Sequence, residues 1–538
     1  MSSKDTKETN VLAQASILMV AGIVTRIIGV LYRSPVTSII GDEGNGYYSI
    51  AVNIYTMILL ISSYSIPMAV SKVVSAKMVL VIGGIASLIT FFGASVLIPS
   101  NQPKAIPVLR ILAPTIFFSG FLGVFRGYFQ AHRTMIPTSL SQIVEQVANA
   151  VISIGAAVFF IHAFAGGDAD KIPVFGAMGS AAGIGAGVIT GLLFMLFIYS
   201  CNKKYFKKEI QKDDTGVDSS YKDIFRIIFM MVTPVILSTF VYNISTVVDQ
   251  TLFMDIMGFK RMASETAASL YGVFSGKYWV LINVPIALAN SMSTAMIPAI
   301  SGSYELKDYK KCRGHVRQAI HFTMVISIPA AIGMGALAYP IMEVLFPQKA
   351  TIDLAVSILR TGCISIIFYA LSTVSNGVLQ GIGKVNIPLR NAAVSLVLHV
   401  VLLTPLLYFT NLNLYALVFA TMFYAFLMCL LNNLSVRKYL GYHQEMKRTF
   451  MIPLLSSVIM GILCYVFYQG IYLILSGIFG SFIHLRILVF ICLMISVGFA
   501  VIVYFVLVLK LKGITEAELR NFPKGNMLVR MAKKSKLL

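Results

Sequence analysis

Long apolar runs follow one another along this chain of 538 residues, and they constrain its fold more than any other feature. A helix that crosses a bilayer needs about 20 mainly apolar residues. Only 12% of the residues are charged and 57% are apolar, whereas soluble domains carry about 25% charged residues. The sequence therefore predicts an all-α polytopic membrane protein. It has fourteen candidate transmembrane helices, near 11–33, 47–73, 79–98, 105–128, 138–162, 174–200, 224–254, 272–299, 317–342, 355–381, 387–410, 413–435, 449–475 and 483–509.

The charges in the loops predict how these spans are oriented. The chain has 43 lysines and arginines against 22 acids, and a cytoplasmic N-terminus places most of the basic residues in the inner loops. The outer loops hold only Lys104, Lys171, Lys260, Arg261, Lys349 and Arg486. Because positive residues gather on the cytoplasmic side, we expect cytoplasmic N- and C-termini. Membrane orientation thus accounts for the basic balance, and no nucleic-acid partner is indicated.

Two stretches of the chain share Leu-Arg, Gly, Gln and Pro at nearly constant spacing. They lie at 109–110, 127, 130 and 137, and again 250 residues later, or 251 at the proline, at 359–360, 377, 380 and 388. Each stretch covers the fourth span of a six-span unit. The repeat predicts two six-helix lobes plus two C-terminal helices, an arrangement that places transporter substrate sites between the halves. The predicted domains are an N-lobe at 1–200, a cytoplasmic linker at 201–222, a C-lobe at 223–437, the last two spans at 449–510 and a basic cytoplasmic tail at 511–538.

The repeat has a gap between the second and fourth spans of the first half. Tyr48 and Tyr55 match Tyr271 and Tyr278 at an offset of 223, about 27 residues less than the later offset. Either a loop is absent from this protein, or the printed sequence omits one. Four residues are few for a turn between antiparallel spans, which favours omission.

Seven charged side chains fall within the predicted spans or at their ends. They are Arg26, Arg33, Arg110, Lys277, Arg360, Glu145 and Asp249. A charge at mid-membrane costs at least about 2.5–3.5 kcal/mol, so such residues face a wet cavity or a partner. Five basic groups against two acids leave an excess of three positive charges, which favours an anionic substrate.

Arg26 and Arg33 lie two turns apart on one face of the first span, and Lys277 lies near the start of the eighth. These three are the substrate-binding candidates. The alternative for Arg33 and Lys277 is that each side chain extends to the outer interface.

The other charged residues are secondary candidates. Glu145 and Asp249 either bind a coupling cation or form structural ion pairs, so coupling to a Na⁺ or H⁺ gradient or to the membrane potential is open. Arg110 and Arg360 occupy matched repeat positions, which favours a shared structural role such as capping or headgroup contact. Lys72 is a further secondary candidate.

No catalytic constellation occurs in the sequence. There is no G-x-S-x-G, no H-E-x-x-H and no nucleotide-binding loop, and the six cysteines form no C-x-x-C pair. We therefore expect no enzyme activity, no catalytic residue, no cofactor and no metal site.

Three motifs carry a family resemblance: Thr25 to Gly29, Gly41 to Tyr48, and Ile66 to Lys72. Together they resemble the polysaccharide-export branch of the MOP superfamily, within it the stage V sporulation protein B and YtgP group of MurJ-type lipid II flippases from Gram-positive bacteria. The resemblance implies fourteen helices around a central cavity, a lipid-facing groove at 449–510 and alternating access in a bacterial cell membrane. It implies as substrate an undecaprenyl-pyrophosphate-linked peptidoglycan precursor, moved from the inner to the outer leaflet. Its first-span basic residues carry over to Arg26 and Arg33, one residue more widely spaced here, and Lys277 stands near a span-eight arginine.

Other functions remain open alongside this one. A flippase for another lipid-linked polysaccharide would share the pyrophosphate, whereas a cation-coupled multidrug exporter would favour an acidic cavity. A membrane glycosyltransferase would need a large outer loop with paired carboxylates, and no outer loop exceeds roughly twenty residues. We expect a monomer.

The basic tail contains a local helix signal. Thr515 and Glu518 form a predicted capping box. Together with the basic residues around them, they predict a short helix on the anionic inner leaflet.

Overall fold

The computed structural model describes residues 3–63, 79–131, 134–211, 240, 243–346, 348–479, 484–520 and 525–535. These residues are helical nearly throughout, and no strand occurs among them. The chain divides into two compact units. Unit 1 comprises Met1–Gly276 with Pro388–Leu417, and unit 2 comprises Lys277–Ile387 with Val418–Leu538.

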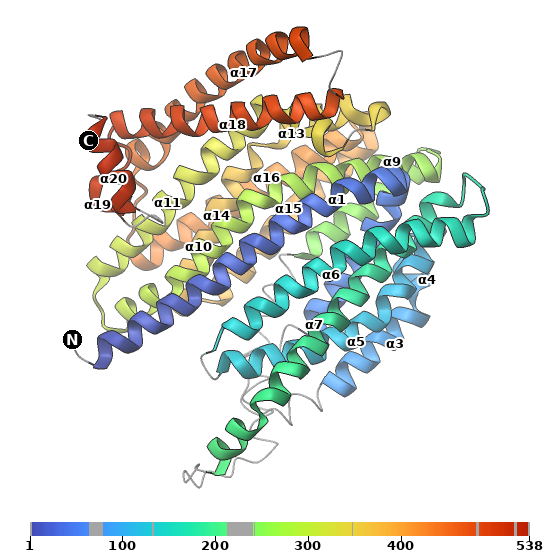
Figure 1. Cartoon of the computed structure of the whole chain (residues 1–538), viewed down its shortest axis with the longest axis horizontal. Helices are drawn as coiled ribbons and strands as arrows, with labels where there is room; N and C mark the ends of the chain where they lie inside the picture. The colour runs from blue at the N-terminus through green and yellow to red at the C-terminus, as the bar shows by residue number, and fades with distance from the viewer. Residues whose placement is uncertain are drawn as a thin grey trace. The chain divides into compact units, whose positions relative to one another are not determined.

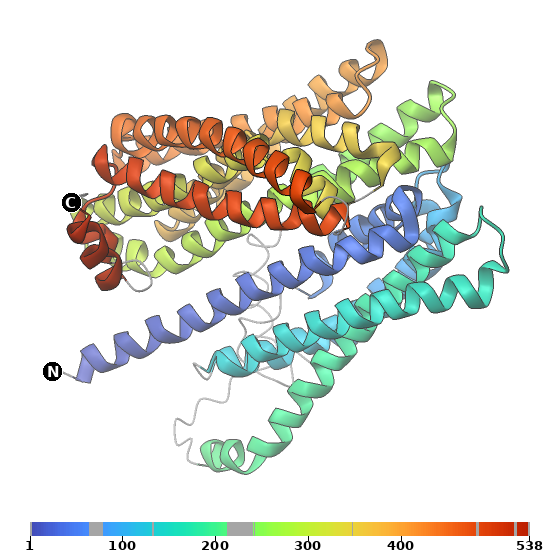
Figure 2. The ribbon, with the colours of Figure 1, turned by 45° about the horizontal axis from the view of Figure 1, so that its top comes forward.

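Unit 1 is a bundle of long helices from the first half of the chain, joined by one from the second. Its helices α6 and α7 lie side by side, α5 packs on α7, and α1 packs on α6 (Figures 1 and 2). The bounds are α1 Ser3–Ser63, α3 Gly84–Phe92, α4 Ala94–Leu97, α5 Ile106–Ala131, α6 Ile136–Phe160, α7 Ile172–Gln211, a helix over 243–259, α9 Ser264–Val273 and α15 Asn386–Phe409.

Unit 2 has two apolar cores. Helices α10, α11, α14 and α16 share the first, while α17, α18 and the C-terminal helices share the second with α11. The bounds are α10 Trp279–Glu305, α11 Tyr309–Ala336, α12 Ala338–Leu345, α13 Ile352–Gly362, α14 Ser365–Gly381, α16 Leu414–Leu440, α17 Ile452–Phe479, α18 Leu485–Lys510, α19 Glu516–Arg520 and α20 Gly525–Lys534.

The helices confirm the prediction of an all-α polytopic membrane protein. Ten helices in the described residues are long and apolar enough to cross a membrane, and a bent pair, α13 with α14, would make an eleventh. One of the ten, Val20–Leu60, takes in parts of two predicted spans, and α1 is interrupted at Gly41, whose φ of +71° is not helical. Most of the predicted span at 224–254 lies outside the described residues. The count of fourteen therefore stays a prediction.

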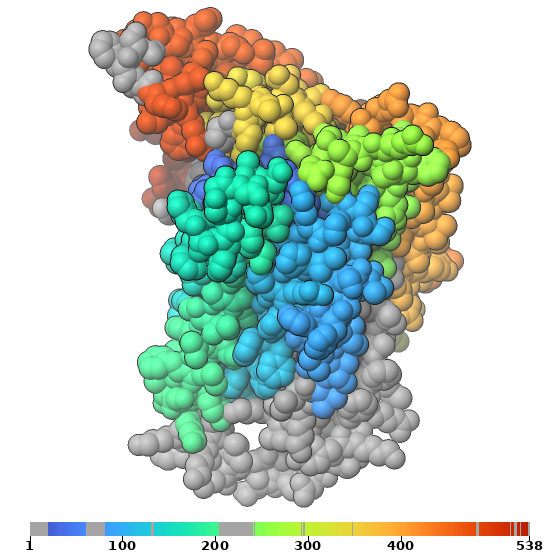
Figure 3. Space-filling view, turned by 90° about the vertical axis from the view of Figure 1, so that its right-hand side faces the viewer, coloured from blue at the N-terminus to red at the C-terminus, as the bar shows by residue number. Residues whose placement is uncertain are grey.

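Large apolar side chains cover the outer faces of these helices. Phe92 and Val96 are 73% and 87% exposed in unit 1, and Leu473 on α17 is 69% exposed in unit 2. Figure 3 shows the unit 1 surface of residues 79–131 (blue) beside that of residues 134–211 (teal to green). Apolar exposure of this extent is expected where lipid is the solvent.

The two repeat copies differ at their fourth span. In the first half, α5 runs unbroken through Pro114, whereas the matching segment of the second half bends by 48° between α13 and α14. At this bend a Cβ on Gly362 would lie 2.3 Å from the hydroxyl oxygen of the buried Tyr278. The bend thus depends on a glycine at the contact. The two compact units are defined by which residues pack together, whereas the predicted domains were defined by the sequence repeat. The predicted domain boundaries therefore stay predictions.

Candidate functional site

The two arginines of the first span have different surroundings on α1. Arg26 is exposed, and within the described part of the chain its guanidinium has neither an ion pair nor a hydrogen bond. Arg33 is partly buried. Its guanidinium lies 4.5 Å from the centroid of the Tyr48 ring and donates from Nη1 to Asn45 Oδ1 at 3.4 Å. Arg33 is therefore held by the segment of α1 beyond Gly41, while Arg26 is available for a ligand.

The glycine-rich motif at 41–46 serves close packing of α1 on α9. A Cβ on Gly46 would lie 2.0 Å from the Ala268 carbonyl oxygen, and one on Gly272 would lie 2.0 Å from the Asp42 carbonyl oxygen. Only glycine allows two backbones to approach so closely. Since Asn45 also donates to Thr37 Oγ1 at 3.3 Å, the acceptor of Arg33 is fixed in position.

Lys277 is fully buried in unit 2. Its Nζ donates to Thr351 Oγ1 at 2.8 Å, just before α13 begins. A cation in such a place has lost its water and needs polar partners such as this hydroxyl to offset the cost. Lys277 belongs to a different compact unit from Arg26 and Arg33, so its predicted role in substrate binding stays a prediction.

Glu145 lies in an ion pair between α5 and α6. Arg126 Nη2 is 2.6 Å from Glu145 Oε2, and Arg126 Nε donates to Ser141 Oγ at 2.8 Å. Of the two roles predicted for Glu145, a coupling-cation ligand or a member of a structural ion pair, this contact corresponds to the ion pair. The sequence pattern did not single out Arg126, because it lies at the end of its span beside the basic inner loops.

A polar stripe continues from this pair along α6 towards α1. Asn149 donates to Gln146 Oε1 at 3.3 Å and to the Tyr32 hydroxyl at 3.5 Å. A Cβ on Gly29 would lie 3.5 Å from Gln146 Nε2. The stripe therefore meets α1 close to the turn that carries Arg26.

Asp249 is paired with a histidine deep inside unit 1. Its Oδ1 contacts His399 Nε2, and the two residues are only 4% and 0% exposed. Beside them, Asn53 donates to Gln250 Oε1 at 2.9 Å and to the Tyr271 hydroxyl at 3.0 Å. The result is a buried polar network that joins α1, the helix over 243–259, α9 and α15.

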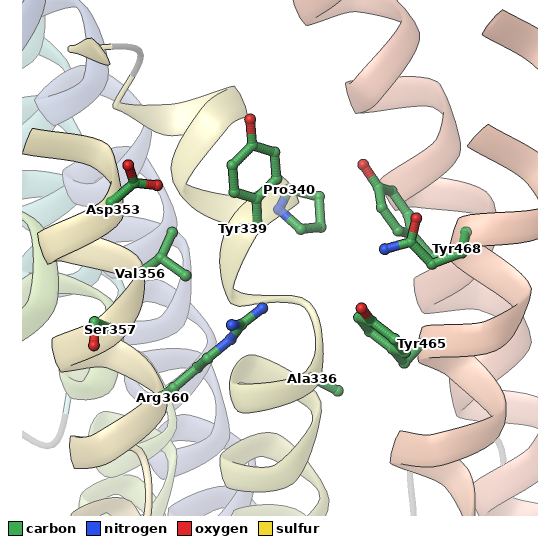
Figure 4. Close-up of a pocket in the computed structure, with 10 residues that line it drawn as sticks. Ala336, Tyr339, Pro340, Asp353, Val356, Ser357, Arg360, Tyr465 and Tyr468 are labelled. Carbon is green, nitrogen blue, oxygen red and sulfur yellow. The ribbon is translucent and has the colours of Figure 1, made fainter. Parts of the chain in front are cut away.

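The matched arginines of the repeat are both exposed. Arg110 lies 6.0 Å from the centroid of the Phe91 ring, and Arg360 lines a cavity of about 290 Å³ in unit 2 (Figure 4). Lys72 lies outside the described residues. Among the residues that the structure describes, no three His, Cys, Asp or Glu side chains gather as a metal site would require.

Known proteins match this chain over most of its length. The model of the family "Lipid II flippase MurJ" matches residues 65–490. The chain belongs to the MurJ lipid II flippase family. This result confirms the resemblance seen in the sequence motifs, and the MurJ family places the protein in a cell membrane as a multi-pass protein.

Curated relatives agree with membership of the MurJ family. The chain is 25% identical to lipid II flippase MurJ of Bacillus subtilis (strain 168) over 482 residues, which cover 83% of this chain and 86% of that protein. It is 26% identical to stage V sporulation protein B of the same organism over 353 residues, 61% of this chain and 65% of the relative.

Solved structures show that the fold is shared more widely than MurJ. A lipid II flippase MurJ in an inward closed conformation matches with a TM-score of 0.65 at 15% identity, covering 91% of this chain and 97% of that one. An outward-facing multidrug resistance MATE family transporter of the MOP superfamily matches with a TM-score of 0.54 at 16% identity, covering 80% and 96%. The fold alone therefore does not separate lipid from drug transport.

Proposed function

We propose that this protein is a transporter that flips the lipid-linked peptidoglycan precursor lipid II from the inner to the outer leaflet by alternating access. The observation that carries the proposal is the MurJ family match over residues 65–490. Arg26 supports it, because its exposed guanidinium has no ion pair or hydrogen bond among the described residues and lies on a helix long and apolar enough to cross a membrane. The location is the bacterial cytoplasmic membrane, with both termini on the inner side as the loop charges indicate.

Arg26 is the residue proposed to bind the substrate pyrophosphate first. A guanidinium offers two parallel N–H donors that match phosphate oxygens, whereas lysine acts as a point charge. Arg33 adds a second positive charge, held in place by Asn45 and Tyr48. Lys277, a buried cation of unit 2, stays a predicted further substrate-binding residue.

Asp249 and His399 are the proposed coupling site. Ionisable residues inside a membrane commonly form proton relays, and this pair is buried between helices that are far apart in the sequence. Hard cations such as Na⁺ prefer oxygen ligands, but here an imidazole nitrogen faces the carboxylate. A proton therefore suits the pair better than sodium, and a proton gradient is the proposed source of coupling.

A flippase for another lipid-linked polysaccharide is the second candidate. The relative named stage V sporulation protein B, which does not carry the flippase name, favours it. The pyrophosphate interaction would be the same for both substrates, so the arginines do not distinguish them.

The test is growth of cells depleted of their own lipid II flippase and supplied with variants of this protein. Arg26→Ala should abolish rescue at normal membrane expression, because removal of an unpaired membrane charge does not cost folding stability. Arg26→Lys should restore little. Arg110→Ala, which removes the exposed arginine beside Phe91, is the matched control and should rescue once growth is normalised to expression. Normal growth with Arg26→Ala would eliminate the pyrophosphate role, and failure of the unmodified protein to rescue would eliminate lipid II as substrate.

A further inference from the structure

A cavity in unit 2 combines charges and phenol rings in a way that transport does not require. It lies between α12, the first turns of α13, and the middle of α17 (Figure 4). Its volume is about 290 Å³, at the low end of the roughly 300–1,000 Å³ typical of small-molecule pockets. It has room for a small headgroup and not for a sugar-peptide.

One positive and one negative side chain line this cavity. Asp353 and Arg360 lie two turns apart on one face of α13, and Figure 4 shows the Arg360 guanidinium directed from α13 towards the opening. In the described ranges, neither side chain has an ion-pair or hydrogen-bond partner. Charges of both signs that have no partner among the described residues favour, in one cavity, a ligand that carries both signs.

Three tyrosines complete the lining. Tyr339 comes from α12, and Tyr465 and Tyr468 come from α17, on the opposite side of the opening (Figure 4). Phenol rings attract cations through their faces, and their hydroxyls bond to phosphate oxygens. The cavity therefore offers groups for an ammonium as well as for a phosphate.

Apart from Arg360, the polar positions of α13 that line the cavity have no polar counterpart in the first copy of the internal repeat. Arg110 matches Arg360, but prolines at 103 and 107 stand where the second half has Asp353 and Ser357. Arg110 lies near the Phe91 ring. The wall formed by α17 lies outside the repeat. A purely structural role of the arginine would not need these extra polar groups.

The surface beside the cavity is suited to acyl chains. On α17, the residues next to Tyr465 are large, apolar and exposed: Ile462 is 61% and Val466 is 62% exposed. A molecule with its polar end in the cavity would therefore lay its hydrocarbon along α17. This feature favours a membrane lipid over a soluble phosphate compound.

We propose that the cavity binds the headgroup of a zwitterionic phospholipid of the phosphoethanolamine type. Arg360 binds the phosphate, while Asp353 and the tyrosine rings bind the ammonium. Such a lipid would join α13 to α17 and stabilise unit 2 independently of the transported substrate. Near the end of α12, Arg486 Nε donates to the Val344 carbonyl oxygen at 2.8 Å, a direct contact that the lipid would reinforce.

The test is native mass spectrometry of the full-length protein, purified with equimolar phosphatidylethanolamine and phosphatidylglycerol. We expect one retained phosphatidylethanolamine on the wild type and on the matched control Arg110→Gln. Arg360→Gln and Asp353→Asn should each lower that occupancy about ten-fold, since each loses one charge-assisted contact. Both side chains are exposed and unpaired within the described chain, so both variants should fold.

Three results would overturn the proposal. The first is equal retention of phosphatidylethanolamine by wild type and Arg360→Gln. The second is a preference for phosphatidylglycerol, which lacks the ammonium. The third is displacement of the lipid by equimolar soluble phosphoethanolamine, which would remove the role of the acyl chains on α17.

Discussion

The buried pair of Asp249 and His399 makes a quantitative prediction about stability. His399→Leu leaves a carboxylate that is 4% exposed without its partner, and Asp249→Leu leaves an imidazole that is fully buried. Removal of one member of a buried hydrogen-bonded pair costs about 1–3 kcal/mol, because the polar group that remains has lost both water and that partner. We expect each single variant to be destabilised by about that amount.

The double variant should recover most of the loss. Replacement of both members of a buried ion pair by apolar groups of similar volume is often neutral or stabilising. Its free energy of unfolding should thus be higher than that of either single variant. The destabilisation of the double variant should differ from the sum of the two single losses by well over the roughly 0.3–0.5 kcal/mol seen for independent sites. The neighbouring bonds from Asn53 to Gln250 and Tyr271 do not involve either residue and should persist.

The assay is SDS-induced unfolding of the purified protein in mixed micelles, followed by helicity, for the wild type and the three variants. A second readout is flipping in proteoliposomes with and without an imposed pH gradient. The double variant should be stable and yet not respond to the gradient. If the single losses simply add in the double variant, the two residues do not act as a pair. If the stable double variant still responds to the gradient, they are not the coupling site.

Three further predictions follow from local geometry. Gly276→Ala should destabilise the protein by about 1–3 kcal/mol, because its Cβ would lie 1.9 Å from Asn45 Nδ2, whereas Gly22→Ala, with nothing within 4 Å, should not; equal unfolding curves would refute the close contact of α1 with the segment that follows α9. In the tail, burial raises the pKa of Glu518, but hydrogen bonds from Thr515 and the charge of Arg448 outweigh it and hold that pKa below the ordinary 4.5. This carboxylate therefore stabilises α19 above pH 4.5, and the contribution is lost as the pH falls through the folded pKa. Hydrogen exchange at 516–520 should rise at acid pH in the wild type and already at pH 7 in Glu518→Gln, but not in a control variant of the exposed Arg530, Arg530→Gln; unchanged exchange would contradict this. Finally, an impermeant thiol reagent should label a cysteine at position 168 and not one at 208 in intact cells, and the reverse pattern would refute the proposed orientation.

Local features of the sequence were enough to predict the class of fold. In lipid every backbone polar group must be satisfied within its own helix, so each span must be a continuous apolar run that can be recognised without its neighbours. The same locality explains the capping box: Thr515 N donates to Glu518 Oε2 at 2.9 Å, as the spacing predicts. The tail also shows the limit of such reasoning, because Val529 and Ala532 of α20 pack into the core beside α18. The predicted contact of the basic tail with anionic lipid stays a prediction.

The partners of the intramembrane charges were decided only by tertiary structure. Asp249 and His399 are 150 residues apart, and Arg126 meets Glu145 across two helices. Hydropathy places each of these residues at a depth in the membrane but does not say which face of its helix meets which neighbour. That choice depends on close packing, such as the contact that Gly46 and Gly272 allow between α1 and α9. The cavity at Arg360 likewise needs Tyr465 and Tyr468 of α17, which lie more than a hundred residues further along the chain, because a binding site forms only where side chains from distant segments converge.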